Sequence, residues 1–190
     1  MKLDRHGKAT PLEFADYIKL RDGFTLEHYR TILDIGYYTG ERWGAILRLQ
    51  VCDLYVDPAR RLPHRDITFR KNTRKDKQTR QCPIARALAL RLKTYNPPLD
   101  GYLFPSPDLA GMHLSDRSAD AALRRAIQRC GMSGLGYSTH STRRGLIDRM
   151  HQAGTSLKVI QSITGHKSLN VLSGYIDVSD KMRRNAIEVA

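Results

Sequence analysis

Two short stretches of this sequence place arginine where it could bind an anion. In TGERWGAILRLQVCD, Arg42 follows a Thr-Gly pair and lies at the start of a predicted helix. In THSTRRG, His140 and Arg143 are three residues apart and so share one face of a helix. A guanidinium offers paired donors that match a phosphate, and it does not deprotonate in proteins. These arginines could therefore neutralise the charge that develops on non-bridging oxygens when a nucleophile attacks phosphorus.

Two further stretches supply groups that could attack phosphorus or protonate a leaving oxygen. In TGHKSLNVLSGYIDVS, His166 precedes a short amphipathic segment and Tyr175 follows nine residues later. The basic stretch RKNTRKDKQTR contains Lys75, eight residues before Pro83. Tyrosine can act as a nucleophile, and lysine or histidine can act as a general acid. Taken one at a time, each of these residues also fits an ordinary core, surface or phosphate-contact role.

The net charge of the chain indicates a phosphate-bearing partner. Lys and Arg number 32 against 19 Asp and Glu, which gives a formal net charge of +13. The excess is clustered at 70–80, 124–125, 143–144 and 181–184. A charged surface that merely keeps the protein soluble is the alternative, but clustered cations are what binding to a nucleic acid backbone rewards. We therefore expect a nucleic-acid-binding protein.

Length and composition are those of a single domain without a membrane span. The 190 residues suit one domain, and no run approaches the roughly 20 apolar residues of a membrane-spanning helix. Cys52, Cys82 and Cys130 form no CxxC pair and predict reduced core residues of a cytoplasmic, nucleoid-associated protein. No histidine pair has the spacing of a zinc protease, and no carboxylate cluster would hold magnesium. We expect no cofactor, and any phosphodiester cleavage should proceed without a metal.

The N-terminal half should contain helices and a small sheet. Residues 1–23 are expected to be an arm or linker, and Thr25 is a good N-cap for a helix over 26–36. A second helix should cover 41–50 and a third 85–95. Alternating apolar residues predict a three-stranded antiparallel sheet with a basic hairpin between its second and third strands. The expected strands are 52–57, 65–70 and 79–84.

The C-terminal half is expected to be helical after an irregular, proline-rich crossing at 96–114. Helices are then predicted from Ser115 to about 130, over 140–153 with Thr139 as its cap, from Thr155 to 163, from Ser168 through Tyr175, and over 180–188. Gly131, Gly154 and Gly165 are well placed to end three of these helices. The predicted fold class is mainly α with a small antiparallel sheet (α+β).

Taken together, the candidate residues resemble the motifs of the tyrosine recombinases, the phage-integrase-like site-specific recombinases. That family has an Arg after a Thr-Gly turn and a hairpin Lys eight residues before a Pro. It continues with His-x-x-Arg, Gly-His, and a Tyr nine residues after that His. All six positions are filled here, in order, by Arg42, Lys75, His140, Arg143, His166 and Tyr175. The resemblance covers about residues 24–188 and implies the catalytic core of a DNA breaking-and-rejoining enzyme.

The resemblance also implies how such a core would act. Tyr175 would attack a phosphodiester of duplex DNA and form a 3′-phosphotyrosyl bond, with His166 beside the phosphate. That bond stores the phosphodiester energy, so neither ATP nor a metal would be needed. Arg42 and Arg143 would bind the non-bridging oxygens.

Two further roles and a set of DNA contacts complete the expected site. Lys75 would protonate the leaving 5′-oxygen, and His140 would assist as acid/base and hydrogen-bond donor. Contacts with the DNA backbone are expected from the side chains of Arg70, Lys71, Arg74, Lys77, Arg80, Arg144 and Lys167.

The sequence departs from the family pattern in a few places. Ala45 stands where a supporting glutamate is common, and Thr142 and Arg144 stand where leucine and histidine are common. Residues 24–190 would be the catalytic domain, without the usual N-terminal clamp domain. We expect either a fragment of a longer recombinase or a short, single-domain member.

The expected partner is double-stranded DNA, bound by a homotetramer on paired sites, with a monomer as the form in isolation. The helix over 180–188 would pack on a neighbouring protomer or on its own domain. Two alternatives remain open at this point: a type IB topoisomerase that relaxes DNA, and a DNA-binding protein of the same fold that no longer cuts.

Overall fold

The computed structural model describes residues 7–73, 77–166, 168–175 and 180–188. The chain divides into two compact units, Met1–Leu146 and Ile147–Ala190, called here the first and the second unit. The division falls within helix α6 (Ser141–Gln152), which begins in the first unit and ends in the second. Among the described residues, no helix is both long and apolar enough to cross a membrane.

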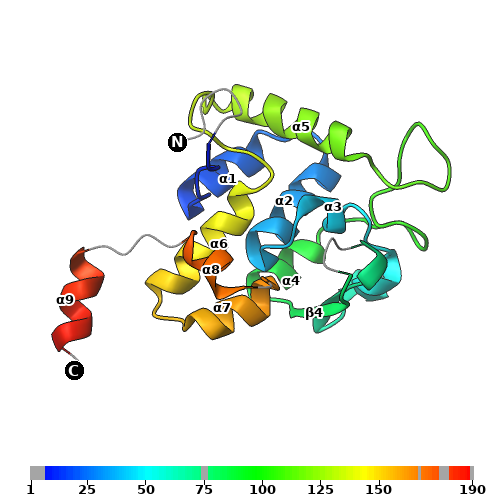
Figure 1. Ribbon diagram of the computed structural model, residues 1–190. Helices are drawn as coiled ribbons and strands as arrows, with labels where there is room; N and C mark the ends of the chain where they lie inside the picture. The colour runs from blue at the N-terminus through cyan, green and yellow to red at the C-terminus, as the bar shows by residue number, and fades with distance from the viewer. Residues whose placement is uncertain (1–6, 74–76, 167, 176–179, 189–190) are drawn as a thin grey trace. The chain divides into compact units, whose positions relative to one another are not determined.

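The first unit is built around one buried helix. Its helices are α1 (Phe14–Asp22), α2 (Glu27–Thr39), α3 (Trp43–Ile46), α4 (Arg86–Leu92), α5 (Asp116–Arg129) and the start of α6. Helix α2 packs against α1, α3, α4 and α5 (Figure 1). Ile32, Leu33 and Ile35 of α2 are almost fully buried, so the apolar periodicity that predicted this helix marks the centre of the core.

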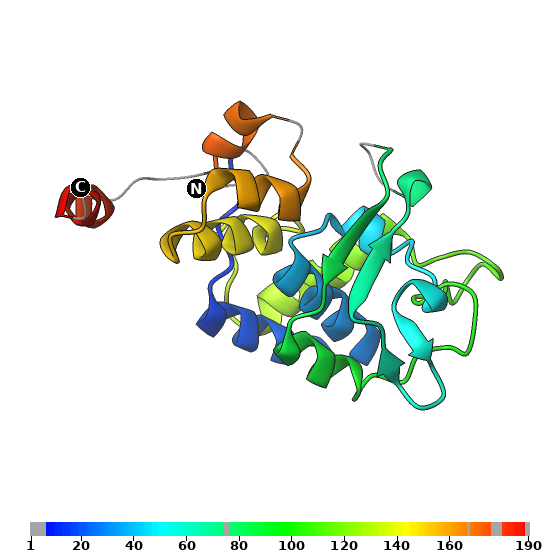
Figure 2. The ribbon, with the colours of Figure 1, turned by 90° about the horizontal axis from the view of Figure 1, so that it is seen from below.

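The strands form two separate two-stranded sheets, which corrects the expected three-stranded sheet. Strand β1 (Tyr55–Asp57) pairs with β2 (Leu62–Pro63), and β3 (Asp66–Phe69) pairs with β4 (Arg80–Pro83), both antiparallel (Figure 2). The first expected strand therefore pairs with two residues that lie outside the expected strands. Proline has no backbone N–H to extend a ladder, which limits β2 to a short strand that ends at Pro63.

The helix after the Thr-Gly turn is shorter than predicted. The expected helix over 41–50 is only one turn long, Trp43–Ile46, and a separate 3₁₀ turn follows at Val51–Asp53. That turn is closed by a capping box, in which the amide of Gln50 donates to Asp53 Oδ2 at 2.9 Å.

Of the three cysteines, Cys82 is buried, Cys130 is half-buried and Cys52 is exposed, so the prediction of three core cysteines is wrong for Cys52.

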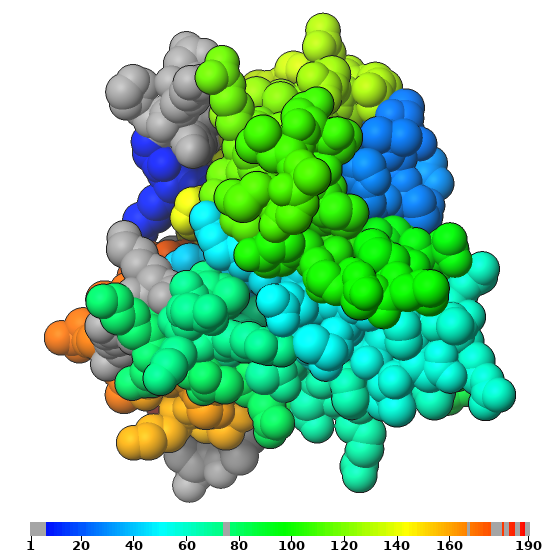
Figure 3. Space-filling view, turned by 90° about the vertical axis from the view of Figure 1, so that its right-hand side faces the viewer, coloured from blue at the N-terminus to red at the C-terminus, as the bar shows by residue number. Residues whose placement is uncertain are grey.

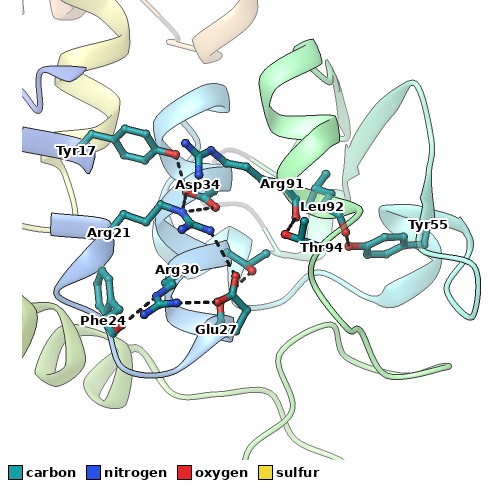
Figure 4. Close-up of polar contacts among 11 residues, drawn as sticks. Tyr17, Arg21, Phe24, Glu27, Arg30, Asp34, Tyr55, Arg91, Leu92 and Thr94 are labelled. Carbon is teal, nitrogen blue, oxygen red and sulfur yellow. Dashed lines mark hydrogen bonds and ion pairs between the residues drawn. The ribbon is translucent and has the colours of Figure 1, made fainter. Parts of the chain in front are cut away.

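Helix α1 occupies residues that the sequence analysis assigned to an arm, and a buried polar cluster attaches it to α2. The Asp34 carboxylate accepts from the Tyr17 hydroxyl at 2.6 Å and from Arg21 Nε at 3.0 Å (Figure 4). Burial raises the pKa of the Asp34 carboxyl, while these two bonds oppose that rise. The guanidinium of Arg91 lies 5.5 Å from the centre of the Tyr17 ring. Residues 14–22 are thus an integral helix of the first unit.

The crossing between α4 and α5 is irregular, as expected, but it is attached to the core. Leu103 and Phe104 are almost fully buried. A backbone bridge joins Tyr102 to Gln50, and Figure 3 shows the green surface of this crossing beside the cyan surface near residue 50. Helix α5 then begins as predicted, because the Ser115 hydroxyl accepts from the amide of Ser118 at 3.0 Å.

The segment before α1 lies directly against the start of α6. The amide of Leu12 donates to the carbonyl of Ser141 at 3.0 Å, and Leu12 is fully buried. A Cβ on Gly145 would lie 2.3 Å from the carbonyl oxygen of Leu12. Only glycine leaves room for this close approach of two backbones.

Replacing Gly145 with alanine is expected to lower the free energy of unfolding by about 3 kcal/mol, because the obstacle is backbone and cannot rotate away. For a chain of this size that corresponds to a drop in Tm of about 10 °C, measurable by thermal unfolding. Gly44→Ala is the control, since a Cβ there would meet only the flexible ends of Arg48 and Asp116. Equal Tm values for the two variants would contradict the inferred close packing.

The second unit contains the rest of α6 with α7 (Leu157–Thr164), α8 (Leu169–Ser173) and α9 (Asp180–Glu188). Its small core is formed by Ile147, Ile160 and Leu172. Helix α7 is capped by Ser156 rather than by the predicted Thr155, and α8 is capped by Ser168 as predicted. Tyr175 lies just beyond α8 instead of inside it.

Candidate active site

The turn that carries Arg42 is fixed by its own backbone and side chains. Helix α2 ends at Gly40, whose φ of 62° is left-handed, the conformation that glycine adopts most readily. The amide of Arg42 donates to Glu41 Oε1 at 2.8 Å. Arg42 is the N-cap residue of α3 and is half-buried. Its side chain therefore starts from a well-defined backbone position.

Arg143 connects helix α6 to this turn. Its Nη1 donates to the carbonyl of Gly40 at 2.9 Å, and only 2% of the residue is exposed. His140 lies immediately before α6 and is exposed, whereas the sequence predicted it on the helix itself. One of the two arginines expected to bind phosphate, Arg143, is thus hydrogen-bonded to the turn that carries the other, Arg42.

Arg42, His140 and Arg143 line a single cavity of the first unit with a volume of about 520 Å³. Trp43, Arg48 and Thr73 are also on its wall. Three of the six predicted residues therefore meet around one hollow that presents cations. Such a hollow could hold the two non-bridging oxygens of a phosphodiester.

The hairpin lysine falls outside the described residues. Thr73, two positions before Lys75, lines the same cavity as Arg42, and the next described residues, from Lys77 on, lead to β4. Arg74 and Lys167, two of the expected DNA contacts, also lie outside the described part of the chain.

His166 and Tyr175 are close together in the second unit. Their ring centres are 5.3 Å apart with an angle of 54° between the ring planes. Only 7% of His166 is exposed, while Tyr175 is half-buried against the core of this unit. The Gly-His motif and the tyrosine nine residues later thus meet in space, as their predicted roles require.

The orientation of the His166 ring follows from its contact with Thr164. The Thr164 hydroxyl is 2.6 Å from the carbonyl of Ile160, to which it donates, and 2.7 Å from His166 Nδ1. A hydroxyl has one proton to donate, so Nδ1 must donate to Thr164. In the neutral imidazole, Nε2 is then the acceptor and could receive a proton. Gln161 also fixes the segment by donating to the carbonyl of His166 at 2.9 Å.

The remaining expected DNA contacts differ in their surroundings. Lys71 and Lys77 are exposed. Arg70 donates to Asp53 at 2.6 Å, and this hydrogen bond raises the pKa of Arg70, whose side chain stays 43% exposed. Arg144 is 9% exposed, and the Arg80 side chain is 10% exposed and paired with Glu41. The surroundings of these last two arginines leave little guanidinium surface for a DNA backbone.

Sequence reasoning missed two residues that support the site, Glu41 and Thr164. Both stand next to a motif that was recognised, in TGERWG and TGHKS. Their side chains bond to Arg42 and His166, contacts that adjacency alone does not reveal.

Comparisons with known proteins identify the family of the chain. The phage integrase family model matches residues 15–182. Tyrosine recombinase XerC of Chlamydia caviae is 27% identical over 194 residues, which covers 96% of this chain and 61% of that protein. A tyrosine recombinase of Pseudothermotoga lettingae is 27% identical over 172 residues, covering 86% of this chain and 55% of that protein. The chain thus spans less than two thirds of the length of these relatives.

Solved structures share the fold. The Tn1549 transposon integrase in complex with a circular intermediate DNA has a TM-score of 0.73 at 18% identity, covering 99% of this chain and 68% of that one. The XerH recombinase bound to difH substrate has a TM-score of 0.71 at 18% identity, covering 97% of this chain and 55% of that one. With a family model that matches nearly its whole length, the chain belongs to the phage integrase family and has the fold of a tyrosine recombinase catalytic domain.

Proposed function

We propose that this chain is the catalytic domain of a site-specific recombinase that cleaves and rejoins duplex DNA through a 3′-phosphotyrosyl intermediate. The observation that carries the proposal is the grouping of Arg42, His140 and Arg143 around one cavity. The pairing of His166 with Tyr175 in the second unit supports it. The relatives named tyrosine recombinase add to this support.

In the proposed reaction, the Tyr175 hydroxyl attacks phosphorus and a Tyr–O–P bond forms as the P–O5′ bond breaks. Arg42 and Arg143 bind the non-bridging oxygens and stabilise their increased charge in the transition state. The phenolic proton passes to a neighbouring base, for which His166 is suited by its acceptor nitrogen. Lys75 gives its proton to the departing 5′-oxygen, with His140 assisting. Reversal with a different 5′-hydroxyl rejoins the strands without ATP.

The proposed substrate is double-stranded DNA. XerH in its complex is bound to difH, and the Tn1549 integrase to a circular intermediate DNA. The net charge of +13 supports the same kind of partner. We further propose that this catalytic domain, α1 included, acts within a longer recombinase, and that four copies assemble on two DNA sites, with α9 as a candidate contact between copies.

The proposed chemistry predicts a covalent protein–DNA adduct that forms in EDTA. Supercoiled plasmid carrying the DNA that flanks the gene should be incubated with the protein and then denatured with SDS. Because cationic side chains take the place of a metal, the adduct yield should be the same with EDTA and with Mg²⁺.

The same gel also reports the form of the broken strand. The proposal requires a free 5′-hydroxyl on one side of the break and protein on the 3′ side. Cleavage that occurs only with Mg²⁺ and leaves no attached protein would contradict it.

A further inference from the structure

We propose that Glu41 and Arg80 form a buried ion pair that holds Arg42 in position to bind the attacked phosphate. Both would be positioning residues, acting through Arg42 without touching DNA. The inference rests on the proposed function, because it assigns a purpose to the backbone position of Arg42.

The two oxygens of the Glu41 carboxylate have separate partners. Oε1 accepts from the amide of Arg42 at 2.8 Å, and Oε2 lies 2.6 Å from Nη2 of Arg80. The side chains of Glu41 and Arg80 are 1% and 10% exposed. A charge-assisted hydrogen bond to an amide in such dry surroundings is short and directional. It therefore fixes Arg42, the N-cap residue of α3.

Arg80 depends on Glu41 for neutralisation. Its Nε and Nη1 are buried and have no hydrogen-bond partner among the described residues. Its guanidinium carbon lies 5.7 Å from the centre of the Phe69 ring, a weaker cation–π contact. The same apolar surroundings raise the pKa of the Cys82 thiol, mainly through burial. A buried guanidinium with so few partners is stable only beside its carboxylate.

The ion pair connects two parts of the predicted catalytic machinery. Arg80 begins β4 and pairs with Phe69 at the end of β3, the last ladder position before the connection that contains Lys75. Glu41 belongs to the turn whose Gly40 carbonyl accepts from Arg143. The turn is thus held by α6 through Arg143 and by the hairpin through Arg80. Loss of either partner of the ion pair should break the connection between the hairpin and this turn. Arg42 would then be held less firmly.

The test separates positioning of Arg42 from general support of the fold. Once the cleaved phosphate has been mapped in the plasmid assay, two synthetic duplexes are compared, one natural and one with a neutral methylphosphonate at that position. A methylphosphonate lacks the anionic oxygen that Arg42 would neutralise. The variants are Glu41→Gln, Arg80→Met and Arg80→Lys. Asp57→Asn is the matched control, because its partner Arg60 is 86% exposed and the pair lies on the surface.

We expect Glu41→Gln and Arg80→Met to slow adduct formation about 100-fold on the natural duplex. On the methylphosphonate duplex, the rates of these two variants should be only about fivefold or less below the wild-type rate. The position of Arg42 matters less there, because the phosphate lacks the anionic oxygen that this arginine would neutralise. Arg80→Lys should form the adduct at a rate within about tenfold of wild type, since lysine keeps the positive charge but lacks the planar guanidinium. Asp57→Asn should match wild type on both duplexes.

Equal losses on the two duplexes would overturn the proposal and leave the ion pair with a role in stability only. A loss of DNA affinity in Arg80→Met with a shallower salt dependence would also overturn it, because Arg80 would then be a phosphate contact.

Hydrogen exchange of the Arg42 amide tests the same contact without any activity. In Glu41→Ala this exchange should accelerate at least tenfold relative to the amides of α2, because its acceptor is gone. If wild type formed no adduct, the proposed function would fail, yet this exchange would still decide whether Glu41 holds Arg42. If the Arg42 amide exchanged at the wild-type rate in Glu41→Ala, the positioning role of Glu41 would be wrong.

Discussion

Replacing Tyr175 with phenylalanine is expected to abolish the covalent adduct while the protein stays folded. The substitution removes only the hydroxyl and keeps the ring that lies 5.3 Å from the His166 ring and packs on the core of the second unit. Loss of a nucleophile lowers rates by about 10⁵-fold or more, so the adduct should fall to background. The measurement is the fraction of DNA that stays bound to protein in SDS.

Tyr102→Phe provides a matched control for this experiment. Tyr102 lies in the crossing of the first unit, and its ring centre is also 5.3 Å from a histidine ring, that of His113. The control should form as much adduct as wild type. An adduct that persists at the wild-type level in Tyr175→Phe would show that another residue attacks the phosphate.

Replacing Arg143 with alanine should have the second-largest effect, because this side chain has two tasks. It supports the Arg42 turn through the Gly40 carbonyl, and it offers charge to the cavity. We expect the rate of adduct formation at saturating DNA to fall about 10³-fold or more. Removing a buried partner of a carbonyl should also lower the free energy of unfolding by about 2 kcal/mol.

Arg143→Lys separates the two tasks. A lysine keeps the charge but has no planar fork to reach both the carbonyl and a phosphate oxygen, so a loss of about 10²-fold should remain with less destabilisation. Arg60→Ala is the control, since its side chain is 86% exposed, and it should leave the rate unchanged. If Arg143→Ala changed only the DNA concentration needed for half-maximal rate, Arg143 would bind DNA without stabilising the transition state.

Local signals in the sequence predicted much of the C-terminal half. Ser115 and Ser168 cap helices as expected, and Gly165 ends α7 in the left-handed conformation. Caps and glycine stops depend on neighbouring residues, so a single sequence contains them. Family motifs singled out Arg42 and Arg143, which line one cavity, while the roles of these residues stay predictions.

Long-range pairing accounts for what could not be predicted. Helix α1 was assigned to an arm, and its attachment depends on a residue of the next helix, Asp34, which accepts from Tyr17. The sheet was misjudged because strand alternation does not reveal which strands pair. The ion pair of Arg80 could not be predicted either, because its partner Glu41 is 39 positions away in the sequence. A contact of Arg80 with DNA stays a prediction.

The most direct test of the central claim is to identify the residue that carries the DNA. The SDS-stable adduct formed in EDTA should be digested with nuclease and trypsin and then analysed by mass spectrometry. Cleavage after Lys167 and Lys181 releases the peptide SLNVLSGYIDVSDK, which contains one tyrosine. We expect a nucleotide joined through its 3′-phosphate to Tyr175 in this peptide. A nucleotide attached to any other residue, or joined through a 5′-phosphate, would contradict the central claim.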